Sequence, residues 1–175
     1  MKKFLLFFAF ATLLGFTSCS DDEEELPPTS SEIITANVWA VESSAVEIQV
    51  LTETFGDTLG LLDGFERTTL QFDQDGTLEI VNTETGDREF GTWAFLNNDT
   101  EIRFSGIITD EETEGLEGFE LSEEQIAALQ TFTVNELTAT RLAIENENEI
   151  TVELPDVPIP IPVTVRLNLT FIPEM

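Results

Sequence analysis

Strict alternation of apolar and polar residues near the C-terminus limits the folds open to this chain more than any other feature. On one side of the pattern lie Val163, Val165, Leu167, Leu169 and Phe171. The residues between them are Thr164, Arg166, Asn168 and Thr170. Because successive side chains of a strand point to opposite faces, the pattern predicts a strand with one face on a core and the other in solvent.

Shorter alternating segments separated by turn residues precede this one. We expect strands over 38–42 and 46–50 (one long or broken strand), 68–72, 77–81, 88–95, 101–105, 131–134, 137–144 and 149–154. Asp-Gly, Thr-Gly-Asp and Asn-Asn-Asp sequences between them are typical of hairpin turns. Helical patterns are confined to 51–62, where glycines interrupt them, and to 122–129, which opens with the capping-box pattern Ser-Glu-Glu-Gln.

The fold class that follows is all-β. The segments predict a single antiparallel up-and-down β-barrel of about eight strands, because many short strands joined by tight turns are typical of barrels and sandwiches. A closed barrel is favoured over a sandwich since it leaves no exposed strand edge.

The N-terminus has the pattern of an export signal. Lys2 and Lys3 precede an apolar run from Phe4 to Phe16, and small polar residues lead to Cys19, the one cysteine of the chain. The run is too short for a transmembrane helix, which needs roughly 20 apolar residues. This stretch resembles a bacterial lipoprotein signal, which implies cleavage after residue 18 and acylation of Cys19.

An acidic segment follows the cysteine. Ser20, Asp21, Asp22 and Glu23 begin a run that continues through two more glutamates into a Pro/Ser stretch, which predicts an extended tether over 19–32. Ser followed by acids directly after the lipidated cysteine is similar to the surface-export signal of Bacteroidetes lipoproteins. The resemblance implies a protein anchored by lipid to the outer membrane and exposed on the cell surface.

One domain remains, over 33–175. The chain has seven Lys plus Arg against 35 Asp plus Glu, a formal charge of -28, and removing residues 1–18 removes both lysines. This charge argues against nucleic-acid binding, which needs clustered Lys and Arg. The membrane, through the anchor, is the expected partner, and we expect the domain to be a monomer.

The order of elements resembles the lipocalin-like domains of small Bacteroidetes lipoproteins. The resemblance rests on 37–39 (Asn-Val-Trp), 70–77 (Leu-Gln-Phe-Asp-Gln-Asp-Gly-Thr), 91–93 (Gly-Thr-Trp) and 134–138 (Val-Asn-Glu-Leu-Thr), and it spans roughly 33–172. It implies a cup with Trp39 closing its base, an arginine (Arg141 or Arg166) stacking on Trp39, and a small hydrophobic ligand. An exposed arginine that balances nearby acids is the alternative. Residues 106–130 have the character of an insertion.

Few residues suit catalysis. The chain lacks His and Tyr, and its mature part lacks Lys, so imidazole bases, Ser-His and Cys-His pairs and His-ligated metals are excluded. We expect no enzyme, no catalytic residues, no cofactor and no metal site. Carboxylate pairs for glycoside hydrolysis have no location that the sequence alone defines.

Four local features have alternative interpretations. Asp73, Asp75 and Gly76 suggest calcium, but a hairpin turn is favoured, and the acid-rich stretch 110–124 suggests either a calcium site or a solvated loop. Trp39 and Trp93 are core residues or cavity lining. The Pro-rich stretch 155–162 is a stiff connector or a ridge for a partner.

The leading hypothesis is therefore a lipid-anchored, non-catalytic barrel that binds a small apolar ligand. The alternatives are an interaction lipoprotein that meets a protein or glycan through its acidic loop or Pro-rich connector, and a calcium-dependent adhesin or hydrolase.

Overall fold

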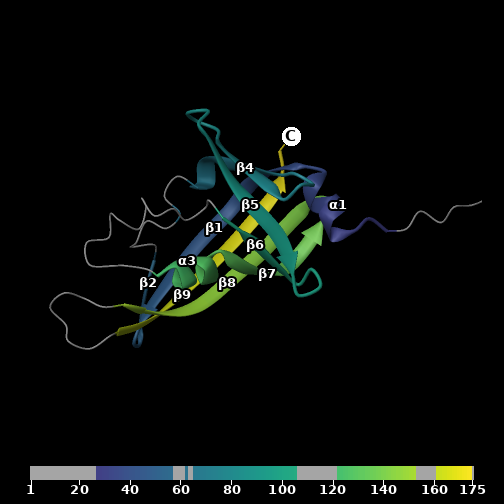
Figure 1. Cartoon of the computed structure of the whole chain (residues 1–175). Coiled ribbons are helices and arrows are strands. Elements are labelled where there is room, and N and C mark those ends of the chain that lie inside the picture. The colour runs from purple at the N-terminus through teal and green to yellow at the C-terminus, as the bar shows by residue number, and fades with distance from the viewer. Residues whose placement is uncertain (1–26, 57–61, 63–64, 106–121, 153–160, 175) are drawn as a thin grey trace, which may run out of the picture.

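The computed structural model describes residues 27–56, 62, 65–105, 122–152 and 161–174 (Figure 1). Its helices are α1 (Ser30–Thr35), the 3-10 helix η1 (Phe65–Arg67) and α3 (Glu123–Leu129). Its strands are β1 (Val38–Val50), β2 (Glu53–Phe55), β3 (Thr68–Phe72), β4 (Thr77–Asn82), β5 (Arg88–Leu96), β6 (Glu101–Phe104), β7 (Thr131–Thr138), β8 (Arg141–Val152) and β9 (Ile161–Pro173).

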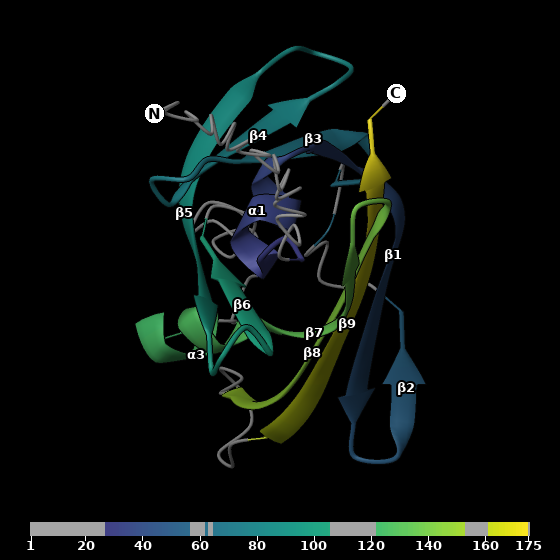
Figure 2. The same cartoon turned by 90° about the vertical axis from the view of Figure 1, so that its right-hand side faces the viewer.

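Eight strands form a closed antiparallel barrel. Strands β3 to β9 pair with their sequence neighbours, and β1 pairs with both β3 and β9, which closes the ring seen in Figure 2. Strand β2 pairs only with the end of β1 and is not part of the ring. The all-β class and the closed up-and-down barrel expected from the alternation are confirmed.

The barrel wall is uneven in height. Strands β1, β8 and β9 have 13, 12 and 13 residues, whereas β3, β4 and β6 have five, six and four. The long strands lie side by side and extend beyond the rest of the barrel (Figure 1). The first strand is continuous, as one of the two expectations had it, with a bulge between Val41 and Ser43.

The expected strand boundaries between 131 and 154 were wrong. The sequence suggested a break at Asn135-Glu136, but the structure has an irregularity in the β7–β8 register there, and the chain turns between Thr138 and Arg141 instead. The polar residues 145–148, expected to separate two strands, lie within β8. Hydrogen bonds to helix α3 allow this polar stretch to remain a strand, as described below.

The helix suggested for 51–62 is also not found in its described part. Leu51 has a positive φ of 57°, and the chain returns as β2, so 53–55 are a strand. In contrast, the capping box at Ser122 and Gln125 is present and opens α3, as predicted. Another capping box joins Thr29 and Glu32 and opens α1, which begins three residues before the predicted domain start at 33.

The turns at two other places follow the predicted chemistry. Residues 97–99 all have φ between 50° and 64°, a conformation that Asn and Asp tolerate better than most residues. Gly76 closes the β3–β4 turn with φ of 89°. Gly91 is required for a steric reason, since a Cβ there would lie 2.0 Å from the carbonyl oxygen of Ser105. A glycine in β5 thus permits close approach of the chain that follows β6.

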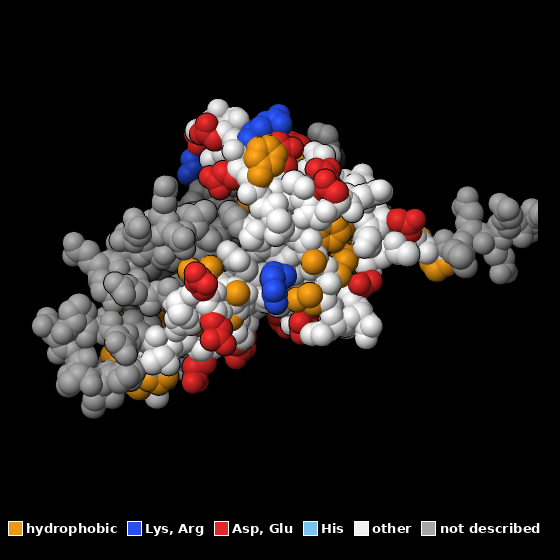
Figure 3. Space-filling model, in the orientation of Figure 1, with side chains coloured by type: hydrophobic (Ala, Val, Ile, Leu, Met, Phe, Trp, Pro, Cys, Tyr) orange, Lys and Arg blue, Asp and Glu red, His pale blue; other side chains and the backbone are white. Residues whose placement is uncertain are grey.

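The core lies inside the ring. All five apolar residues of the C-terminal alternation are buried, with exposed fractions of 3% or less. Among the described residues, no buried side-chain nitrogen or oxygen lacks a hydrogen-bond partner. The outer surface carries acids spread over the visible face with few arginines between them (Figure 3).

Candidate functional site

Helix α1 covers one end of the barrel, where it lies across the ring of strands (Figure 2). The side chains of Ile34 and Trp39 are fully buried, and the indole Nε1 of Trp39 donates a 2.7 Å hydrogen bond to the carbonyl oxygen of Ile34. The lipocalin resemblance implied that Trp39 closes the base of a cup. In the structure Trp39 is buried where α1 meets β1.

The arginines implied to stack on Trp39 lie elsewhere. Arg166 donates hydrogen bonds to Glu147 and to Glu47, and these contacts raise the pKa of its guanidinium. Arg141 forms ion pairs with Glu42 and Glu136 at 3.5 Å. The alternative interpretation, exposed arginines that balance nearby acids, describes both residues.

A row of aromatic rings crosses the barrel interior. Phe104 and Phe132 are stacked with centroids 5.0 Å apart, and Phe72 meets Phe104 edge-on at 5.9 Å. Trp93 continues the row by meeting Phe72 at 5.5 Å, and its Nε1 donates to the backbone oxygen of Asp73. Of the two readings of the tryptophans, core packing is the one seen.

The inner face of the three long strands is apolar beyond the short strands. The buried residues on this face are Val46, Ile48, Ile150, Val163 and Val165. They extend the apolar interior away from α1, along the taller side of the wall. Burying such a surface is favourable by about 25 cal/mol per Å².

Two asparagines interrupt this apolar face. Asn146 lies opposite Leu167 and Asn148 opposite Val165 in the β8–β9 register, so both share the inner face. Asn146 is 3% exposed. The alternation pattern does not reveal this pair, because it predicts a break between strands at these residues.

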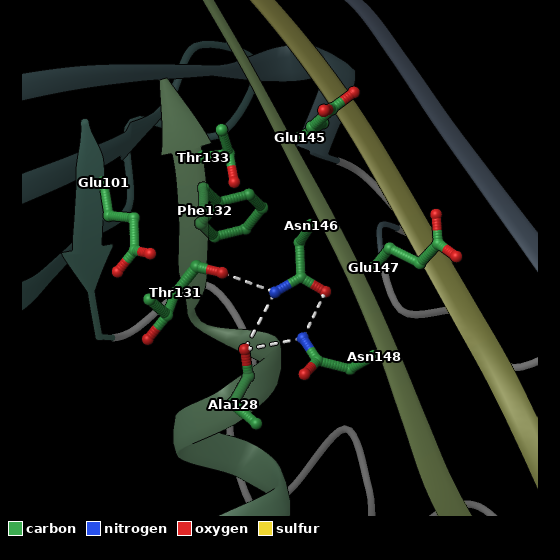
Figure 4. A pocket seen from close by; sticks show the side chains of 9 residues that line it. All are labelled: Glu101, Ala128, Thr131, Phe132, Thr133, Glu145, Asn146, Glu147 and Asn148. Carbon is green, nitrogen blue, oxygen red and sulfur yellow. Dashed lines mark hydrogen bonds between the residues drawn. The ribbon is translucent and has the colours of Figure 1, made fainter. Parts of the chain in front are cut away.

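The asparagine amides bind the end of helix α3. Nδ2 of Asn146 donates to the carbonyl oxygens of Ala128 (2.8 Å) and Thr131 (2.5 Å). Nδ2 of Asn148 donates to the same Ala128 oxygen (3.1 Å) and to Oδ1 of Asn146 (2.9 Å), as Figure 4 shows. The last carbonyls of a helix have no partner within it, so this pair supplies donors that the fold requires.

A small cavity of about 240 Å³ adjoins this network. Its lining residues come from β6, α3, β7 and β8: Glu101, Ala128, Thr131, Phe132, Thr133, Glu145, Asn146, Glu147 and Asn148. In Figure 4 the two asparagine side chains point toward Ala128. Polar groups prevail in this lining, in contrast to the apolar interior behind it.

The Asp73–Gly76 segment is a hairpin turn. Gly76 N donates to the Asp73 carbonyl, and Asp75 Oδ1 accepts from the backbone N–H of Thr77 at 2.9 Å. This bond lowers the pKa of Asp75. Within the described part of the chain, no group of three or more carboxylate or cysteine side chains is arranged to hold a metal ion.

Several predicted features lie outside the described residues. These are Cys19 and the export residues Ser20, Asp21, Asp22 and Glu23, together with most of the acid-rich stretch 110–124 and of the Pro-rich stretch 155–162. At the edge of the latter, Pro162 lies opposite Thr151 in the β8–β9 ladder, so this proline is paired within a strand.

Searches for related proteins give no match among family models, curated proteins or solved structures. In the part of the chain that the structure describes, no helix has the length and apolar character needed to cross a membrane. What the chain does must therefore be inferred from its own residues and geometry.

Proposed function

We propose that this protein is a non-catalytic, lipid-anchored binding protein whose barrel takes up a small hydrophobic ligand. The observation that carries the proposal is the apolar inner face of β1, β8 and β9, which continues beyond the short strands on the side away from α1. A barrel with one covered end and an apolar inner face toward the other has the character of ligand sites, which are concave and mostly apolar.

The anchor is the second part of the proposal. Acylation of Cys19 holds the chain at the outer membrane, and the sequence 20–23 directs it to the cell surface. The ten residues between Cys19 and Ser30 span at most about 35 Å when extended, so the barrel stays close to the bilayer. The acidic outer surface keeps it soluble there and away from nucleic acid.

Uptake of a fluorescent apolar probe, N-phenyl-1-naphthylamine, tests the binding part. We expect the full-length protein, extracted in mild detergent, to bind the probe and to carry a small apolar molecule in native mass spectra. Val165→Thr keeps the shape of the side chain but replaces a methyl group on the inner face with a hydroxyl. It should weaken probe binding by about ten-fold. Thr164→Val changes the neighbouring outward residue and should leave binding unchanged. Equal binding by both variants, or none by the wild type, contradicts the proposal.

Fractionation of cells tests the anchor. Cys19→Ala should release the protein from the membrane fraction, and protease added to intact cells should digest the wild-type protein. Protection from protease with retention in the membrane would place the barrel on the inner side of the outer membrane and contradict surface exposure.

A further inference from the structure

We infer that a ligand enters the barrel interior at the seam between β7 and β8 and that helix α3 closes this entrance. The inference rests on the proposed ligand-binding function. It concerns the route into the interior, which the proposal leaves open.

The strand pairing of the barrel wall is interrupted at this seam. Strand β7 pairs with β8 only from Thr138 opposite Arg141 to Thr133 opposite Glu145. Beyond that point β8 continues to Val152, still paired with β9 on its other side. Helix α3 precedes β7 directly and packs against both β7 and β8 (Figure 1). Side-chain contacts to a helix thus take over from a β-ladder along this part of the wall.

Few contacts hold the helix in place. Of its seven residues, Leu129 is the buried one, and Ile126 is half-buried. The asparagine amides bind its Ala128 carbonyl, and Gln125 Nε2 donates to the Thr151 carbonyl of β8 at 3.2 Å. A helix this short is marginal without tertiary contacts, and such segments are the first to open locally.

The side chains behind the helix belong to the apolar interior. Leu129 and Phe132 are buried, and Asn148 lies opposite Val165 on the inner face. Movement of α3 away from β8 would therefore break the Asn148 bonds and connect the small polar cavity with this interior. Opening the wall on the other side of β8 would instead break a ladder of eleven residue pairs with β9.

Hydrogen exchange of the full-length protein in detergent tests whether helix α3 opens. Asn148→Ala removes the bonds to Ala128 and to Asn146 and should speed exchange of the α3 amides Ile126 and Gln130 on the order of ten-fold, as expected for one or two lost hydrogen bonds. Exchange in β9, at Leu167, should not change. Stopped-flow uptake of N-phenyl-1-naphthylamine should accelerate by a similar factor.

Thr68→Ala is the matched control, because it removes a partly buried hydrogen bond of 2.8 Å from the Thr68 hydroxyl to the Phe65 carbonyl. Thr68 lies in β3, which pairs with neither β7 nor β8. The substitution should alter neither α3 exchange nor probe uptake. Unchanged exchange in Asn148→Ala, or equal acceleration throughout the barrel, would contradict the local opening of α3. Faster exchange without faster probe uptake would contradict the entrance between β7 and β8. If the wild type takes up no probe, the proposed function fails and the entrance with it, while the exchange data still decide whether α3 opens.

Discussion

The indole of Trp39 and the backbone carbonyl of Ile34 join helix α1 to strand β1 through a buried hydrogen bond of 2.7 Å. Both side chains are fully buried, so the bond forms where water does not compete. It fixes the helix that covers one end of the barrel against the strand that closes the ring.

Trp39→Phe should destabilise the fold by about 1–3 kcal/mol, because it leaves the buried Ile34 carbonyl without its donor. Urea denaturation followed by circular dichroism measures the loss. Trp93→Phe is the matched comparison, since the Trp93 indole also donates to a backbone carbonyl, that of Asp73, but from a partly buried position. A loss in Trp39→Phe no larger than that in Trp93→Phe would show that α1 contributes little to closing the barrel.

Gly91→Ala should destabilise the barrel by roughly 1–3 kcal/mol or more, since the added methyl would lie 2.0 Å from the Ser105 carbonyl oxygen and force the backbone to shift. Gly56→Ala provides the control, because no atom lies within 4 Å of a Cβ at that position. Thermal unfolding of the two variants should separate them clearly. Similar melting temperatures would mean that the close approach of Ser105 to β5 is not maintained in solution.

Glu32→Gln should change how stability depends on pH. The Glu32 carboxylate accepts hydrogen bonds from the Thr29 backbone N–H and hydroxyl, which lower its pKa from 4.5. A lowered pKa in the folded state favours the ionised form, so the contribution is complete above pH 4.5 and is lost as pH falls through the folded-state pKa.

The stability difference between wild type and Glu32→Gln should therefore shrink as pH falls below 4.5. Denaturation curves across that range measure it. Glu89→Gln, at an exposed position of β5, corrects for the loss of one negative charge. A difference that stays constant with pH would exclude the carboxylate as the source of the capping effect.

Arg166→Gln should destabilise the fold only slightly, and less still at high salt, because surface ion pairs are weak and screened. The guanidinium links Glu47 of β1 with Glu147 of β8, and the three side chains are 41–59% exposed. Denaturation at low and high salt tests this. Arg103→Gln, which removes a donor to the Thr131 hydroxyl, controls for the change in net charge. A large, salt-independent loss would mean that the pair acts through packing.

Local patterns predicted the strands whose partners are near in sequence. The β3–β4 and β4–β5 hairpins follow from alternation and turn residues, and the capping box at Ser122 located α3. The break expected at 135–136 failed because Asn and Glu there occupy an irregular stretch of β7, while the turn came at Ala139-Thr140.

Asn146 and Asn148 show what a single sequence hides. Burying polar residues on the inner face of a strand costs free energy unless they are hydrogen-bonded. The polar stretch 145–148 therefore predicted a break between two strands. Their partner is the carbonyl of Ala128, which lies 18 and 20 residues away in the chain. The position of helix α3 beside β8 supplies that partner, and alternation carries no information about it.

The pairing of β1 with β9 also determines when this protein can fold. The ion pair between Glu47 and Arg166 spans 119 residues, and eleven residue pairs join the same two strands. Contacts so distant in sequence slow folding, because the chain loses loop entropy before it gains them. A barrel with this topology stays incomplete until its last strand is available to pair with its first. Loss of β9 at any stage would leave β1 and β8 with unpaired edges, which are prone to aggregate.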